Sequence, residues 1–419
     1  MKIKIAFLNN RYGTTRSVRE AFQRSGHEII LIETAQKRVS DIHKEIESCN
    51  PDFIFSSNFH VSDPDSSESI QQTINFVQTS RRPLAVWMYD NPLHQLDIEI
   101  QKALMASPPQ NHLYFVNDKF FSSTLSLWKL PSVHLPLGVN REIFLMRNAG
   151  GEASWVADLR FTGQPLISCR LQDITIESLR AGHKNLYLQE LKEMATRSDC
   201  SENEITSTLE KISVYLDLFF ETYFTTPMDY NRAEQNFYTS IKESCSPEMT
   251  QTAHRLFGRL SSLYSWWQMT SYLTELLPEG LIVQGSPVWK EFFPQQAEEF
   301  RRLSWPELFA SYRATKINFC FTKWSLPTAI HERVFEIYLA GGFPLTDNRE
   351  ELALHFEKDE VVSYRTIDEA KDLIRYFTPR EAERRQFIEK GTTRVLESHT
   401  FDHRIPVLVR SACEHWNIR

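Results

Sequence analysis

The sequence lacks the features that would tie it to a metal framework, a disulfide framework or a membrane. Its six cysteines are scattered, with no Cys-x-x-Cys pair, so neither a zinc site nor a set of disulfides is expected. No apolar run approaches the roughly 18 residues of a transmembrane helix. The apolar start of the chain is too short for the core of a signal peptide. These absences favour a protein of the reducing cytoplasm, without a membrane span.

An excess of basic residues is also missing. The 419 residues carry a formal charge of −7, and 41% of them are apolar. A general nucleic-acid binder would more often be basic, so no nucleic-acid partner is expected. The length exceeds that of one ordinary hydrophobic core, which predicts two or more globular domains.

The first part of the chain alternates apolar runs with amphipathic, helix-like segments. Continuous apolar runs between helices are typical of strands covered on both faces, and hence of a parallel sheet in a doubly wound α/β domain. A first Rossmann-like lobe is therefore predicted over residues 1–145. Its predicted strands cover residues 3–8, 27–33, 52–57, 84–90, 112–118 and 133–138.

A loose segment at 141–157 separates this lobe from a second one, predicted over 155–419. The second lobe begins with the apolar run 155–163 and resumes its α/β alternation at 280–285. Between these runs the sequence is charged, rich in leucine and short of strand signals. This pattern predicts an all-helical insertion over 166–278. The last helices, 392–419, are expected to pack back on the first lobe.

The stretch "HERVFEIYLAGGFPLTDN" at 331–348 raises the question of a ligand site. A helix is predicted from Ser325 to Ala340, with Pro327 in its first turn and Gly341 at its end. The helix is apolar nearly all round, except for a narrow stripe that holds Arg333 and Glu336. One interpretation is an ion pair within the helix. The other is a guanidinium for phosphate and a carboxylate for sugar hydroxyls, next to free N–H groups of the helix start.

The segment "ERVFEIYLAGGFPLTDNREEL" resembles the C-terminal half of retaining-type GT-B glycosyltransferases. It is most similar to the CgeB-like group, with a "glycosyl transferases group 1" C-terminal domain. The runs "YRATKINFCFTKWS", "FEKDEVVSYRTIDEAKDLIRYF", "VWMYDNP", "LPLGVNREIF" and "LRFTGQP" agree with this resemblance. The similarity is good over about 280–405, fair over 1–165 and poor in the helical block.

This resemblance implies transfer of a sugar from a nucleotide-diphosphate sugar, by a metal-independent, bacterial-type enzyme that needs no cofactor. The donor would lie in the second lobe and the acceptor in the first. Arg333 and Glu336 would then take catalytic roles, Glu336 by binding the donor ribose. The implied donor-binding set is Gly163, Gly285, Ser286, Lys323, Thr328, His331, Arg333, Glu336, Gly341 and Gly342. The sequence departs from the pattern at Thr328, where many relatives carry a glutamate that contacts the donor sugar.

The acceptor side is expected at the strand ends of the first lobe. Asp90 ends a predicted strand and is a candidate general base, with Asn91 beside it; the alternative is an Asx turn before a proline. Gly13, after the first strand, allows close backbone approach to a ligand. His399 and His403 lack the partners of a recognised metal motif, so no metal site is predicted.

Two other functions stay open at this point. One is a nucleotide-sugar epimerase or hydrolase on the same fold. The other is a non-catalytic scaffold, which the threonine at 328 and the helical insertion would suit. The acceptor is open among protein, glycan and small molecule, and the insertion could contact the acceptor or a second copy of the chain.

Overall fold

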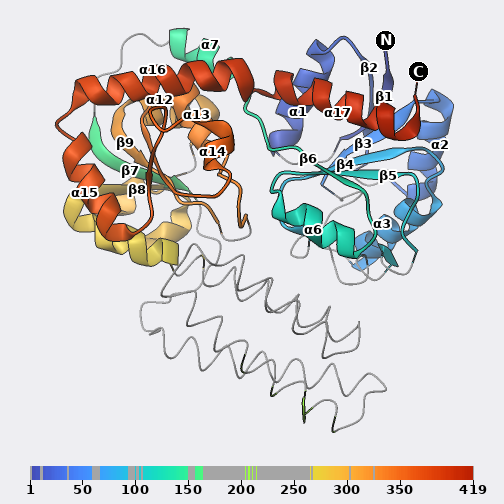
Figure 1. Ribbon diagram of the computed structural model, residues 1–419, viewed down its shortest axis with the longest axis horizontal. Coiled ribbons are helices and arrows are strands. Elements are labelled where there is room, and N and C mark those ends of the chain that lie inside the picture. The colour runs from blue at the N-terminus through green and yellow to red at the C-terminus, as the bar shows by residue number, and fades with distance from the viewer. Residues whose placement is uncertain are drawn as a thin grey trace.

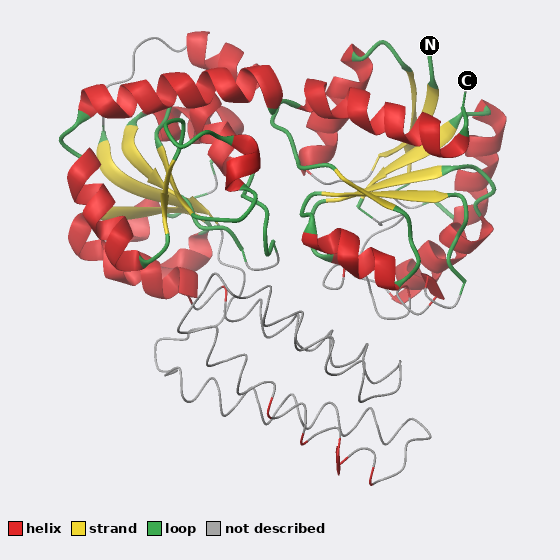
Figure 2. Cartoon of the chain, in the orientation of Figure 1, coloured by secondary structure: helices red, strands yellow, loops and turns green. Residues whose placement is uncertain are grey.

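The computed structural model describes residues 2–9, 13–34, 37–58, 67–92, 107–149, 156–163, 268–301, 303–323 and 326–418, and isolated residues within 100–104 and 203–265. It forms two α/β lobes side by side, each with a sheet between layers of helices (Figures 1 and 2). The predicted helical insertion lies almost wholly outside the described residues.

The first lobe contains a six-stranded parallel sheet in the order β2-β1-β3-β4-β5-β6. Strands β3, β4 and β5 are buried along their whole length, which is why their sequences are apolar without alternation. The elements are β1 (Lys4–Asn9), α1 (Gly13–Arg24), β2 (Glu28–Glu33), α2 (Val39–Cys49), β3 (Phe53–Ser57), α3 (Ser67–Thr79), β4 (Leu84–Met88), β5 (His112–Val116), α6 (Phe120–Leu127) and β6 (Ser132–His134).

The second lobe contains a five-stranded parallel sheet in the order β11-β10-β9-β7-β8. Its strands are β7 (Ala157–Gly163), β8 (Leu281–Gly285), β9 (Thr315–Phe319), β10 (Pro344–Asp347) and β11 (Val362–Tyr364). Its helices are α7 (Glu142–Ala149), α12 (Trp305–Arg313), α13 (Arg333–Ala340), α14 (Leu352–His355), α15 (Ile367–Phe377) and α16 (Glu381–Ser398), with 3-10 turns η2 (Leu277–Glu279), η3 (Pro287–Glu291) and η4 (Pro294–Glu299).

Both sheets reverse their winding after the first strand. β1 lies between β2 and β3, and β7 lies between β8 and β9. In open α/β sheets, ligands bind beyond the carboxyl ends of the strands at such a switch point. The topology therefore marks the ends of β7 and β9 in the second lobe, and of β1 and β3 in the first, as ligand-binding positions.

In the described part of the chain, two segments cross between the lobes, and they touch. Val139 forms a parallel bridge with Thr400, and the amides of Val139 and Phe401 each donate to the opposite crossing at 3.0 Å. A Cβ on Gly138 would lie 2.7 Å from the backbone nitrogen of Phe401, so only glycine permits this approach. Helix α17 (Phe401–Trp416) follows, and its Ile405 and Leu408 enter the core of the first lobe (Figure 1).

The helix predicted from Ser325 is shorter in the structure and begins only at Arg333. Proline disfavours helical backbone in the residue before it, which here is Leu326. Leu326 and Ala329 instead pack in a hydrophobic cluster of the first lobe. Burial against the other lobe therefore overrides the local helical pattern. His399 and His403 also do not share a helix, because His399 caps the end of α16 while His403 belongs to α17.

Helices α13 and α16 pack closely at Gly391, and this contact predicts an unusual mutational effect. A Cβ at Gly391 would lie 2.4 Å from Cε1 of the Tyr338 ring. Glycine to alanine in a helix normally stabilises by about 1 kcal/mol. Here Gly391→Ala should lower the free energy of unfolding by about 1–3 kcal/mol through overpacking. Unfolding in urea measures this free energy. The loss of stability caused by Gly391→Ala should be smaller in a Tyr338→Ala background. An equal loss in both backgrounds would contradict this contact.

Candidate functional site

Arg333 lies at the carboxyl edge of the second sheet, as the first residue of α13. Its guanidinium carbon is 5.9 Å from the centre of the Phe161 ring, and its Nη1 would lie 3.7 Å from a Cβ placed on Gly163. Among the described residues, no carboxylate lies within 4.0 Å of this guanidinium. The ion pair between Arg333 and Glu336 that the sequence allows is therefore not formed. The guanidinium lies at the end of β7, and its pKa is raised despite burial, because nearby groups that include Glu336 and Glu332 favour the cation.

Two glycines form the floor beside this guanidinium. Gly163 and Gly285 are paired residues at the ends of β7 and β8. A Cβ on Gly285 would lie 2.1 Å from the carbonyl oxygen of Gly163, and its φ of +130° also favours glycine. The indole Nε1 of Trp289 donates to that carbonyl at 3.0 Å, and Ser286 accepts from the amide of Val288 at 3.3 Å. The chain's own packing requires glycine at both positions, because a Cβ on Gly163 would also lie 2.8 Å from the Phe161 ring.

His331 caps the start of α13. Its Nδ1 accepts from the amide of Arg333 at 3.1 Å, and the amides of Val334 and Phe335 donate to the carbonyls of His331 and Glu332. The free N–H groups were expected at a helix start near 325–329; the structure starts the helix at Arg333 instead, and the amides of Thr328 and Ala329 donate to Asp118. Burial lowers the pKa of His331 to about 4, and the positive charges of Arg333 and Lys323 add to this effect. His331 is neutral at pH 7, and any anion here must be held by side-chain cations.

Glu336 lies one helical turn after Glu332, and both are partly buried. Burial and the charge of Glu332 together raise the pKa of Glu336 to about 7, against the opposing effect of Arg333. A carboxyl group that titrates near neutral pH can accept from or donate to a hydroxyl. Glu332 was not among the predicted site residues. Its spacing of four from Glu336 placed it on the same helical face, but the sequence could not show that both would be buried.

The other predicted donor residues divide into two groups. Lys323 follows β9 and acts electrostatically on His331 and Glu332, so it lies with the cluster around Arg333. Gly341 and Gly342 lie at the opposite end of α13, where Gly341 caps the helix with a φ of +87°. An eight-residue helix is about 12 Å long, so these two glycines are remote from Arg333.

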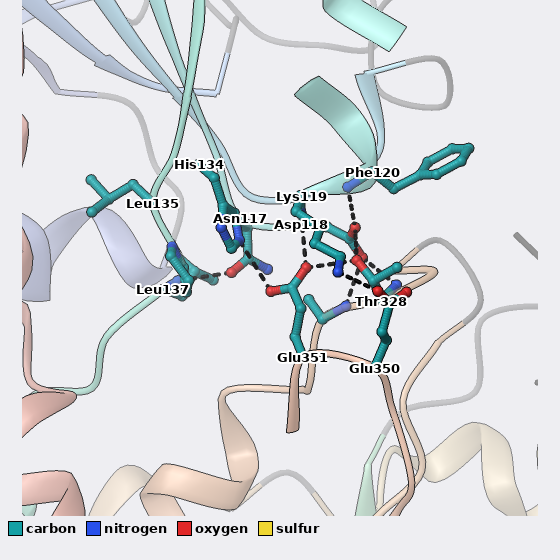
Figure 3. A network of polar contacts seen from close by, with 12 residues as sticks. Asn117, Asp118, Lys119, Phe120, His134, Leu135, Leu137, Thr328, Glu350 and Glu351 are labelled. Carbon is teal, nitrogen blue, oxygen red and sulfur yellow. Dashed lines mark hydrogen bonds and ion pairs between the residues drawn. The ribbon is translucent and has the colours of Figure 1, made fainter. Parts of the chain in front are cut away.

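Thr328 lies between the lobes, in a polar network that the sequence analysis missed (Figure 3). Asp118, after β5, accepts from the amides of Thr328 at 2.7 Å and Ala329 at 2.8 Å. Glu351, after β10, accepts from the amide of Lys119 at 2.8 Å and lies 3.1 Å from Nε2 of His134. Residues from the carboxyl ends of both sheets therefore meet, which shows that these two edges face one another.

The predicted acceptor residues lie along that edge of the first sheet. Asp90 and Asn91 follow β4, and Asn91 is fully buried. Tyr89, just before them, donates to Ser57 at 2.7 Å and fixes the end of β4 against β3. Gly13 begins α1, which follows β1.

A pocket of about 620 Å³ opens next to the network, at the ends of β10 and β11. Its walls include Pro327, Arg349, Glu350, Phe356 and Arg365. Nε of Arg349 donates to Asp347 at 2.6 Å. The volume is in the range of small-molecule sites, and the mixed charges suit a polar, hydroxyl-rich group.

Within the described ranges, no three His, Cys, Asp or Glu side chains are grouped so that they could hold a metal ion. A search of the same residues finds no helix with the length and apolar character needed to cross a membrane.

Two Rossmann-like lobes with facing carboxyl edges define the GT-B fold. Sucrose-phosphate synthase from Thermosynechococcus elongatus shares it, with a TM-score of 0.50, 10% identity and 99% of each chain covered. A glycosyltransferase from Rickettsia africae ESF-5 superposes at a TM-score of 0.47, with 9% identity and all of both chains covered. Anabaena Alr3699/HepE in complex with UDP and glucose gives a TM-score of 0.47, with 10% identity and full coverage of both chains.

Residues 268–410 match the family model described as glycosyl transferase-like. This segment contains α13, the Glu332–Glu336 pair and Glu351. No curated protein matches the chain in sequence. The likeness in sequence to a glycosyltransferase family therefore covers the later part of the second lobe and the start of α17.

The raised pKa of Glu336 predicts that this residue destabilises the free protein at high pH. Its folded pKa, about 7, lies above the ordinary value, so its contribution to stability is complete at low pH and is lost as pH rises through 7. Glu336→Gln should raise the free energy of unfolding at pH 8 by up to about 3 kcal/mol and leave it nearly unchanged at pH 4. Urea unfolding at both pH values tests this. The exposed Glu389→Gln is the control, and equal effects at the two pH values would refute the assignment.

Proposed function

We propose that the protein is a glycosyltransferase that moves a sugar from a nucleotide-diphosphate sugar to an acceptor, with the donor in the second lobe. The observation that carries this proposal is Arg333. Among the described residues its guanidinium has no carboxylate within 4.0 Å, and it lies beside Gly163 and Gly285 at the ends of β7 and β8. The glycosyl transferase-like match includes Arg333 and supports the same conclusion.

The roles of the donor-side residues follow from their chemistry. A diphosphate above Gly163 and Gly285 would meet the backbone closely, with Arg333 and Lys323 as its cations. These cations would stabilise the charge that grows on the leaving diphosphate as the glycosidic bond breaks. Glu336 would accept from the ribose hydroxyls. Glu332, one turn earlier on the same side, is a second hydroxyl acceptor in this proposal.

The acceptor would bind at the facing edge of the first sheet. Asp90, at the end of β4, is the candidate to take the proton of the attacking hydroxyl. The lobes would need to close to bring Asp90 and the donor together and to exclude water, which would otherwise hydrolyse the donor.

Thr328 limits what is proposed about the sugar. Its hydroxyl and amide are both engaged in the contact between the lobes. We therefore do not assign it a contact with the donor sugar. The nearby pocket lined by Arg349 and Arg365 is large enough for a sugar-sized group, and no particular sugar or stereochemical outcome is proposed.

Binding of the nucleotides that carry activated sugars tests the donor site directly. Titration calorimetry with UDP, GDP, ADP and CMP should detect one preferred nucleotide. Arg333→Ala should weaken its binding about 10- to 100-fold, because a charge-assisted contact to phosphate is lost. Glu336→Ala should weaken binding about 10-fold through the ribose hydroxyls. Arg375→Ala, on the exposed face of α15, is the matched control and should bind as the parent protein does.

Slow hydrolysis of the matching nucleotide sugar in the absence of an acceptor would support transfer chemistry. Asp90→Asn should preserve nucleotide binding and reduce turnover at least about 100-fold, since only the acceptor side is changed. If none of the nucleotides binds, the proposal fails, and a non-catalytic scaffold becomes the better account. Binding followed by epimerisation of the sugar would identify the other enzyme class.

A further inference from the structure

One guanidinium group binds both of the segments that cross between the lobes. Nε of Arg404 donates to the carbonyl of Pro136 at 2.8 Å, and Nη1 donates to the carbonyl of Ser398 at 2.9 Å. Its Nη2 lies 2.8 Å from Nδ1 of His399. Pro136 lies in the first crossing segment, and the other two residues lie in the second, where α16 ends. Arg404 itself belongs to α17, which packs in the core of the first lobe.

The contacts of His399 determine its tautomer. Nε2 lies 2.9 Å from the carbonyl oxygen of His355, which can only accept, so Nε2 must carry a proton. Nδ1 faces the guanidinium of Arg404, which can only donate, so Nδ1 must accept and carry no proton. The imidazole is therefore neutral. A second proton, on Nδ1, would point at an N–H group of the guanidinium and would break this contact.

The charges around His399 also oppose a second proton. The titratable and charged groups that face it are all basic: His355 on α14, Arg394 on α16, and His403 and Arg404 on α17. Burial lowers the pKa of His399 to about 4, and the positive charge of Arg404 adds to this effect. Burial lowers the pKa of Arg404 only to about 10, so the guanidinium stays charged at neutral pH. The acids Glu351 and Asp402 act on His355 and His403.

The ring of His399 touches the helix of the candidate site. It stacks on the ring of Phe335, with the two centroids 5.1 Å apart and an angle of 9° between the planes. Phe335 lies in α13, between Arg333 and Glu336. A movement of His399 would therefore reach the first turn of α13 through a direct contact.

We propose that His399 and Arg404 form a pin that holds the two crossing segments together, and that the pin holds only while His399 is neutral. Arg404 belongs to a helix of the first lobe, whereas His399 ends a helix of the second. With a neutral imidazole, the guanidinium binds all three of its acceptors at once. After protonation, the contact between the two side chains becomes repulsive, and Arg404 can no longer bind all three.

Both residues are positioning residues in this proposal, because they act through the hinge between the lobes. The backbone hydrogen bonds of Val139 with His399 and Phe401 lie beside the pin, and they lose its support when His399 is protonated. The stacking on Phe335 couples the state of the hinge to α13. The proposal does not depend on the protein being a glycosyltransferase.

Hydrogen exchange in the ligand-free, full-length protein tests the pin. The amides of Val139 and Phe401 each donate to the opposite crossing at 3.0 Å, so their protection reports the hinge. The folded pKa of His399 is lowered, so its contribution is complete above the ordinary histidine pKa of about 6.5 and is lost as pH falls toward 4. After correction for intrinsic exchange, protection should be at least about tenfold greater at pH 7.5 than at pH 5.

A substitution of His399 locates the proton. In His399→Asn, the amide oxygen can accept from Arg404 in place of Nδ1, and the side chain does not titrate. The protection of the two amides should then differ by less than about twofold between pH 5 and pH 7.5. His415→Asn, the same change at an exposed position of α17, is the matched control and should keep the pH dependence of the parent protein.

A substitution of Arg404 tests the other half of the pin. Arg404→Met keeps an unbranched apolar chain and removes the guanidinium. Protection of the Val139 and Phe401 amides should fall about tenfold at pH 7.5, because three hydrogen bonds are lost. The pH dependence should become smaller, since a proton on Nδ1 of His399 no longer meets a cation. Arg410→Met, at an exposed position of the same helix, should behave as the parent protein.

Nitrogen NMR of the His399 ring reads the tautomer without any substitution. At pH 7.5, Nε2 should carry the proton and Nδ1 should not; a proton on Nδ1 would overturn the proposal. Equal protection of the two amides at pH 5 and pH 7.5 would overturn it too, as would full pH dependence in His399→Asn, because another group would then bind the proton. If a variant does not fold, the exchange and the NMR of the parent protein decide. None of these measurements uses a nucleotide, so their outcome is separate from the test of sugar transfer.

Discussion

The acceptance of two backbone amides by Asp118 is the interaction on which the arrangement of the site depends. The amides belong to Thr328 and Ala329 in the second lobe, while Asp118 follows β5 of the first. This contact holds residues 326–331 out of the helix that their sequence favours. Because that segment is bonded to the other lobe, α13 begins only at Arg333. Its first turn places Arg333 and Glu336 at the carboxyl edge of the sheet.

Burial holds Glu336 in a setting where its ionised form costs stability, and its pKa is raised to about 7. Arg333 differs: despite its burial its pKa is raised, because electrostatic interaction with nearby groups, Glu336 and Glu332 among them, favours the cation. Carboxyl groups with such shifted pKa values are often found at ligand sites. A ribose would give Glu336 hydrogen-bond partners, and a diphosphate would place an anion beside Arg333.

Much of the architecture was predictable because strand patterns are strong local signals. The two parallel sheets and the stop of α13 at Gly341 follow from apolar runs and from glycine chemistry. The start of α13 was predicted wrongly, since the burial of Leu326 in the other lobe is not a local property. Asp118 ends its predicted strand just as Asp90 does, so the rule that singled out Asp90 applied to it equally. What the sequence lacked was the pairing of Asp118 with Thr328 and Glu351, which are more than two hundred residues away.

The return of α17 to the first lobe makes that lobe discontinuous in sequence. Phe401, Ile405 and Leu408 belong to the same hydrophobic cluster as Phe7 and Phe55. During synthesis the first strands therefore leave the ribosome long before the helix that completes their core, while every strand of the second lobe emerges before that helix. The second lobe can thus fold while the first still exposes part of its apolar surface. A nascent chain truncated before residue 401 should for this reason be a better substrate for chaperones than either lobe of the finished protein.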